Sequence, residues 1–161
     1  HGTFLRGNFH YVKIDSEFKY YITILNKIIL ANRVKVGWLS GFSSYMDDDV
    51  EIPSFNKFHL GGQTSLRGWY SSKDFEPEPS TGGNVRYLFN SEIRFPLYAR
   101  LGGELFFDVG SLRESDNSML YGWDAGFGLT INTGLGPARI DAAYKRAAGK
   151  PTILFSLLYM F

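Results

Sequence analysis

The sequence contains no cysteine and no long apolar run, and each absence excludes a class of protein. Without cysteine there is no disulfide framework and no thiolate metal site. A membrane-spanning helix needs about 20 consecutive apolar residues, and the longest apolar stretch, 153–161, is about half that length. The formal net charge of +1 gives no electrostatic attraction to nucleic acid. The composition therefore excludes a helical membrane protein and predicts no nucleic-acid partner.

Residue types suited to catalysis or metal binding are few and dispersed. The three histidines, His1, His10 and His59, do not have the spacing of metal ligands. Ser65 has no nearby histidine that would complete a catalytic triad. We therefore predict that the chain is not an enzyme and uses neither a metal ion nor a cofactor.

Aromatic residues and glycine are abundant instead. Aromatic side chains make up 17% of the sequence, and 18 residues are glycine. Both are poor helix formers, and aromatic residues favour the pleated surface of a β-sheet. The composition thus predicts an all-β protein, with a soluble β-sandwich as the alternative to a membrane barrel.

Apolar and polar residues alternate along seven segments, which is the pattern of β-strands whose two faces meet different surroundings. One face of these segments is apolar and contains Val12, Ile14, Phe18, Tyr20, Ile22, Ile24, Val34, Val36, Trp38, Val85, Tyr87, Phe89, Ile93, Phe95, Leu101, Leu105, Phe107, Val109, Tyr121, Trp123, Phe127, Leu129, Ile131, Ile140, Ala142, Tyr144, Ile153, Phe155, Leu157, Tyr159 and Phe161. The opposite face carries charged side chains of both signs together with glycine.

This pattern favours a membrane barrel over a soluble sheet. Soluble strands are typically about 5–6 residues long, whereas outer-membrane strands of about 9–11 residues face lipid with apolar and aromatic side chains and the lumen with polar ones. We therefore predict a transmembrane antiparallel up-and-down β-barrel in the bacterial outer membrane. The residues expected to face lipid include Trp123, Phe127, Tyr159 and Phe161. The residues expected to face the lumen include Glu92, Asp108, Asp124 and Arg139.

Connections between the segments alternate in length. Segments 25–27, 96–98 and 133–137 are short, whereas 42–83, 110–118 and 146–151 are longer. In outer-membrane barrels the short turns are periplasmic and the long loops extracellular. The expected seven strands, the first starting near Asn8, are an odd number, so we infer that upstream strands are missing. A turn at Asp15 and Ser16 would instead make an eighth strand.

The longest connection contains an unusual motif, Phe-His-Leu-Gly-Gly-Gln-Thr-Ser-Leu-Arg-Gly-Trp, at residues 58–69. The paired glycines Gly61 and Gly62 permit tight backbone turns. Arg67, between Leu66 and Gly68, presents a planar fork of five hydrogen-bond donors. By itself, this composition would also suit an ordinary surface loop.

This motif resembles a family signature. Leu60, Gly61 and Gly62, followed by Leu66, Arg67, Gly68 and Trp69, are similar to the sixth extracellular loop of the outer-membrane superfamily that includes BamA, TamA and the two-partner-secretion transporters. Segments 91–96, 106–110 and 136–141 resemble later motifs of that superfamily in the same order. Trp69 replaces the usual Phe or Tyr, and Leu66 a common Val.

The resemblance implies a specific contact and a larger barrel. In that superfamily the loop folds into the lumen and its arginine meets acidic groups on the wall, which implies that Arg67 meets Asp108, with Glu92 as a second partner. An eight-stranded barrel is filled by its own side chains. The loop 43–83 should therefore fold into a barrel of about sixteen strands, of which residues 1–161 form the C-terminal part.

The end of the chain resembles the signal by which outer-membrane barrels are recognised for assembly. Its alternating apolar residues are Phe155, Leu157, Tyr159 and Phe161. As a plain structural feature, the same residues would form a lipid-facing strand.

The resemblance implies a role in the insertion or assembly of outer-membrane proteins or in polypeptide translocation. The expected partners are outer-membrane lipid, client polypeptides, and further barrel strands from upstream chain or a second copy. The alternatives are a membrane anchor or export barrel of a multidomain protein, such as a patatin-like phospholipase, and a small self-associating barrel without periplasmic domains. A passive porin is disfavoured because the loop carrying Arg67 would plug it.

Overall fold

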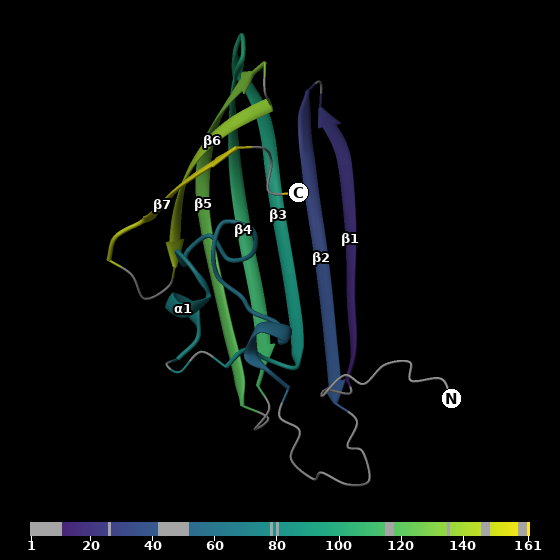
Figure 1. Ribbon diagram of the computed structural model, residues 1–161. Coiled ribbons are helices and arrows are strands. Elements are labelled where there is room, and N and C mark those ends of the chain that lie inside the picture. The colour runs from purple at the N-terminus through teal and green to yellow at the C-terminus, as the bar shows by residue number, and fades with distance from the viewer. Residues whose placement is uncertain are drawn as a thin grey trace, which may run out of the picture.

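A computed structural model describes residues 11–25, 27–41, 52–77, 79, 81–114, 118–134, 136–145, 149–157 and 161. It contains one antiparallel sheet of seven strands that follow one another in chain order (Figure 1). The strands are β1 (Tyr11–Leu25), β2 (Ile28–Gly41), β3 (Val85–Tyr98), β4 (Leu101–Arg113), β5 (Met119–Thr133), β6 (Gly136–Lys145) and β7 (Thr152–Leu157). Two short helices, η1 (Ser54–Asn56) and α1 (Ser72–Phe75), lie in the loop between β2 and β3.

None of the helices in the described part of the chain is long and apolar enough to span a membrane.

The two faces of the sheet differ as the alternation predicts. On one, hereafter the apolar face, Trp123 is 38% exposed and Phe127 is 49% exposed. On the other, the polar face, Glu92 and Asp108 are fully buried, as are Asp124 and, to within 1%, Arg139. Apolar side chains outside and charged side chains inside are the reverse of a soluble protein, so the barrel interpretation is confirmed and the soluble sandwich is wrong.

The first strand is continuous, which removes the alternative of an eighth strand. Asp15 pairs with Gly37 and Ser16 pairs with Val36 in an unbroken antiparallel register. Among the described strands, β1 and β7 each have a single neighbour, so the sheet is open. Seven strands that do not close on themselves were expected from the odd strand count.

Several predicted connections are partly strand. Pro96 pairs with Gly102 inside the β3–β4 ladder, and the reversal comes after Tyr98, at Ala99 with φ of 48°. Residues 110–113 of the predicted connection 110–118 belong to β4. Gly110, the first residue of that predicted connection, lies in β4 beneath Leu60 and Leu66 of the loop, where a Cβ would be tightly packed.

The prediction that Phe161 faces lipid is wrong. Strand β7 is described as far as Leu157 and Phe161 is not itself in a strand, so the alternation of side chains does not determine which face Phe161 takes. The Phe161 ring lies 4.8 Å from the guanidinium of Arg33, and its carbonyl oxygen accepts a hydrogen bond from Arg94 at 3.1 Å. Phe161 therefore packs against side chains of the polar face, whereas Phe155 is exposed on the apolar face. Tyr159 lies outside the described residues.

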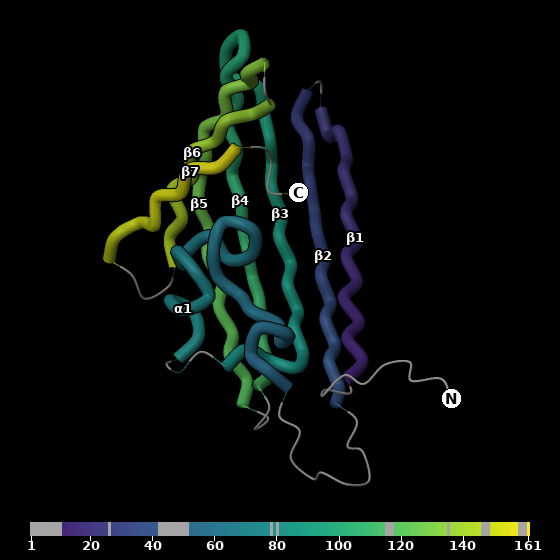
Figure 2. Tube along the Cα trace, viewed as in Figure 1, coloured from purple at the N-terminus to yellow at the C-terminus, as the bar shows by residue number. Residues whose placement is uncertain are grey.

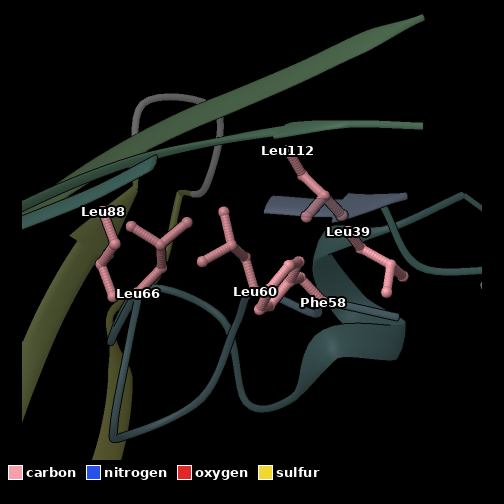
Figure 3. Packing of buried hydrophobic residues seen from close by; sticks show 6 residues of the cluster. All are labelled: Leu39, Phe58, Leu60, Leu66, Leu88 and Leu112. Atoms are coloured by element: carbon pink, nitrogen blue, oxygen red, sulfur yellow. The ribbon is translucent and has the colours of Figure 1, made fainter. Parts of the chain in front are cut away.

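The loop between β2 and β3 turns back over the polar face, where Figure 2 shows its coils in front of the sheet. Its position depends on a small hydrophobic core. Six buried side chains form this core, three from strands and three from the loop: Leu39, Leu88, Leu112, Phe58, Leu60 and Leu66 (Figure 3). Because the strand leucines lie on an otherwise polar face, they mark the area that the loop covers.

Candidate functional site

The glycine pair shapes the turn that carries Arg67. Gly61 and Gly62 have φ angles of 107° and 98°, in the left-handed region that favours glycine. The Gly62 amide donates to the carbonyl oxygens of Leu66 and Trp69, at 3.2 and 2.9 Å. A side chain at Gly61 would collide with the backbone of Ser71. These bonds close the segment between Gly62 and Trp69 into a compact turn with Arg67 near its tip.

Glycines on the polar face receive the apolar side chains of the loop. A Cβ atom added to Gly37 would lie 2.6 Å from the Phe58 ring, and one added to Gly122 would lie 2.6 Å from Trp69. Gly110 lies beneath Leu60, with a corresponding distance of 3.0 Å. Contacts this close are possible only because no Cβ is present, so these glycines act as docking positions for the loop.

Arg67 is fully buried and forms a two-pronged ion pair with Asp108. Its Nε donates to Asp108 Oδ2 at 2.7 Å, and its Nη2 donates to Asp108 Oδ1 at 2.9 Å. Nη1 donates to Glu92 Oε1 at 2.7 Å and to Glu104 Oε1 at 3.4 Å. The Arg67 guanidinium thus uses its planar fork to bridge β3 and β4, a geometry that lysine cannot reproduce.

The surroundings of Arg67 keep it charged despite burial. Its guanidinium lies over the Phe106 ring, 3.5 Å from the centroid. Burial by itself would lower the pKa of Arg67, but the charges of Asp108 and Glu92, with hydrogen bonding to Asp108, raise this pKa above its usual value. Arg67 is therefore a permanent cation in a buried site, where its charge faces those of Asp108 and Glu92.

The ionic network extends beyond the predicted partners on both sides. On one side, Arg139 Nη2 lies 2.9 Å from Asp141 Oδ2 and Nη1 lies 3.3 Å from Glu104 Oε1. On the other, Asn90 donates to Asp108 Oδ1 at 2.7 Å and accepts from Arg33 at 2.7 Å. A chain of charged and amide groups therefore runs across β2, β3, β4 and β6 at the level of Arg67.

The loop contacts every strand of the sheet. The contacts, in strand order, are Lys13 Nζ to the Asn56 oxygen at 2.8 Å, Arg33 to the Thr64 oxygen at 2.8 Å, Asn90 to the Ser65 oxygen at 2.8 Å, Asp108 to Arg67, Gly122 beneath Trp69, Lys145 Nζ to Asp74 Oδ2 at 3.1 Å, and Thr152 Oγ1 to the Gly68 oxygen at 2.8 Å. Detaching the loop would therefore disturb the polar face across its full width.

The structure brings the predicted motif residues together with both predicted acids. Leu60 and Leu66 are in the loop core, Gly61 and Gly62 form the turn, and Trp69 meets Phe75 edge to face at 5.1 Å between ring centroids. Gly68 lies so close to Asp124 that an added Cβ would be 2.7 Å from the Asp124 Cβ. The motif thus forms one continuous contact surface.

Sequence reasoning missed Glu104, Phe106 and Asp141 as parts of the site. A usable signal was present, because Glu104 and Phe106 precede Asp108 on the same strand at the spacing that shares a face. Asp141 follows Arg139 at the same spacing on β6. What the alternation could not show is that the loop lies at this particular level of the sheet.

An open sheet with an apolar outer face, a charged inner face and an inward-docked loop defines an integral β-barrel of the outer membrane. Residues 1–157 match the Omp85 superfamily domain. The chain belongs to the Omp85 superfamily.

Two comparisons with individual proteins agree with this membership. The chain is 30% identical over 125 residues to the outer membrane protein assembly factor BamA of Nitratidesulfovibrio vulgaris, covering 73% of this chain and 15% of that protein. Its fold is similar to a crystal structure of BamA from Haemophilus ducreyi lacking POTRA domains 1–3, with a TM-score of 0.73 and 17% identity, covering 91% of this chain and 34% of the other. The chain thus spans about 15% of the length of its curated relative.

Proposed function

We propose that this barrel acts in the insertion or assembly of outer-membrane proteins, or in polypeptide translocation, with the loop pinned to the wall by Arg67. Membership of the superfamily and similarity to BamA support a role of this kind. The client is then an unfolded polypeptide, and the function is assembly rather than chemical catalysis.

The observation that carries the proposal is the burial of Arg67 between Asp108 and Glu92. A charged side chain withdrawn from water costs several kcal/mol unless its partners are well placed. At 2.7 Å from each carboxylate, Arg67 has such partners. A loop held this way keeps a defined shape inside the barrel, which supports a positioning role at a surface where a client polypeptide is handled.

The proposal also places the chain in the membrane. The loop 43–83 leaves the barrel on the extracellular side and folds into the lumen, and the open edges at β1 and β7 pair with further barrel strands from upstream chain or a second copy. Unpaired backbone groups in hydrocarbon cost several kcal/mol each, so both edges need a partner in lipid. Phe155 and Leu157 on the apolar face, followed by Tyr159, serve as an assembly signal; Phe161 packs with the polar face instead.

The test is a conservative change in the full-length protein. Arg67→Lys keeps the charge but removes the bidentate fork, so we expect insertion of a reporter outer-membrane protein to slow at least about tenfold, the equivalent of one lost charge-assisted bond. Arg100→Lys makes the same change at an exposed arginine and should leave insertion unchanged. Normal insertion by the Arg67→Lys protein would overturn the proposal.

A further inference from the structure

The loop has a second polar contact, away from Arg67, between His59 and Glu76. His59 precedes the Arg67 turn and Glu76 follows it, so the pair joins the two arms of the loop. His59 Nδ1 lies 3.1 Å from both carboxylate oxygens of Glu76, and His59 Nε2 lies 2.9 Å from the carbonyl oxygen of Ser54. Both ring nitrogens therefore face oxygen atoms that only accept hydrogen bonds.

This arrangement distinguishes the two protonation states of the ring. A neutral imidazole has one N–H and can donate to Glu76 or to Ser54, with the lone pair of its other nitrogen facing an oxygen. The imidazolium has two N–H groups and can donate to both. Its charge also faces a carboxylate, and hydrogen bonds between opposite charges are the stronger kind. The protonated ring is therefore the form that makes every contact in this site.

Glu76 transmits the position of His59 to the Arg67 turn. The Glu76 side chain is fully buried, and its Oε1 accepts the backbone N–H of Leu60 at 3.3 Å. Leu60 belongs to the loop core and directly precedes Gly61, where the turn begins. Behind the ring, Gly82 has φ of 72° and leaves no room for a Cβ, which would lie 2.8 Å from His59 Cε1. The ring is thus held on three sides.

Other charged groups surround the pair. Lys57 lies beside His59 across Gly82, where an added Cβ would be 2.9 Å from the Lys57 Cβ. The ring also borders a cavity of about 470 Å³ whose charged lining is Glu17, Lys19, Arg33, Lys35 and Arg86. The cations oppose a charge on His59 and Glu17 favours it, but Glu76 is the group in direct contact.

We propose that His59 and Glu76 are positioning residues for the Arg67 turn and that the imidazolium–carboxylate pair is the form that closes the base of the loop. The contact is then complete when His59 is protonated and loses a hydrogen bond when the ring is neutral. The consequence for client handling rests on the function proposed above, but the effect on loop position does not.

The experiment is amide hydrogen exchange on the full-length protein in detergent between pH 5.5 and 8, corrected for the intrinsic pH dependence of exchange. The reporter is the loop peptide 58–69, and the peptide 101–113 of β4 is the internal reference. We expect protection of the loop to fall about fivefold across this range, the equivalent of one partly exposed charged pair. Protection of the β4 peptide should not change.

Three variants sharpen the test. His59→Phe keeps a ring but has no N–H, and Glu76→Gln keeps the shape without the charge. In both variants, protection of the loop peptide should be as low at every pH as in the unmodified protein at pH 8. His59→Gln can donate without titrating, so it should restore intermediate protection with no pH dependence, which also guards against a fold lost in the Phe variant. His10→Phe removes a different histidine and should retain the full response.

A flat response in the unmodified protein, or an unaltered response in His59→Phe, would overturn the proposal. A pH-dependent loop combined with pH-independent client insertion would leave the positioning pair in place and count against the proposed function alone. The two failures are therefore distinguishable.

Discussion

Charged side chains share the polar face at both ends of the sheet but differ in their surroundings. Across β1 and β2, Glu17 is 32% exposed and lies 3.5 Å from Lys19 and 3.8 Å from Lys35. Across β3 and β4, Glu92 and Asp108 are fully buried at 2.7 Å from Arg67. The alternation is the same in both regions, and the difference comes from the loop, which excludes water from one region only.

Burial changes what an ion pair contributes. Exposed pairs contribute roughly 0–1 kcal/mol because water already solvates both charges. Breaking a buried pair costs about 3–5 kcal/mol because the remaining charge is left without compensation. Single substitutions should therefore lower stability strongly in the covered region, across β3 and β4, and weakly in the open region, across β1 and β2.

The largest effect is expected for Arg67→Ala. Removing this guanidinium leaves Asp108 and Glu92 buried without their cation, at a cost of about 3–5 kcal/mol in the free energy that holds the loop against the sheet. Amide exchange of peptide 58–69 in the full-length protein measures this free energy. Unchanged protection would show that the loop core alone holds the loop and that the two regions do not differ in the way described.

A double-mutant cycle tests whether Arg67 and Asp108 act as a unit. We expect the double variant Arg67→Ala, Asp108→Ala to be little worse than either single variant, so the coupling energy should be close to a single-variant loss, about 3 kcal/mol or more. The same exchange measurement applies. Losses that simply add would mean that the two side chains contribute independently, in conflict with their bidentate geometry.

The docking positions should show an intermediate effect. Gly122→Ala places a Cβ 2.6 Å from Trp69 and 2.8 Å from Phe75, so one of the rings has to move, at a cost of about 1–3 kcal/mol. Gly134→Ala is the matched control, because nothing lies within 4 Å of its Cβ position. Limited proteolysis of the loop compares the two. Equal resistance in both variants would mean that Trp69 is not seated on Gly122.

The smallest effect is expected in the open region. Glu17→Gln removes the carboxylate shared by Lys19, Lys35 and Arg33. It should change stability by less than about 1 kcal/mol, because Glu17 and both lysines are partly exposed and Arg33 keeps its hydrogen bond to Asn90. The shift of electrophoretic mobility on heat denaturation gives the unfolding temperature. A shift as large as that of Arg67→Ala would mean that further barrel strands bury this region too.

Much of the fold could be predicted from the sequence, because period-two alternation specifies a strand and its two faces locally. The continuous first strand, the open seven-stranded sheet and the inward Glu92 and Asp108 all follow from this rule. The rule fails where the local signal has two meanings. Gly110 was placed at the start of a connection but lies in β4 as a docking position, and Phe161 was given a face by alternation although it is not itself in a strand.

The candidate site, like the fold, could be predicted only in part. The motif pointed to Arg67, and resemblance to a family pointed to Asp108 and Glu92, whereas Glu104 and Asp141 were not singled out. Their inclusion depends on the depth at which the loop enters, since only side chains at that level lie within reach of the Arg67 fork. This depth results from Phe58, Leu60 and Trp69 packing against glycines on three separate strands.

By itself, the sequence determined which side chains within the strands face outward and which face inward, because alternation along a strand is a local property of the backbone. Only the tertiary structure decided which inward charges are buried and paired. That outcome depends on a loop from one part of the chain meeting strands from another, and on the exclusion of water between them. Pairs of acidic and basic side chains therefore remain open near β1 and become a buried network around Arg67.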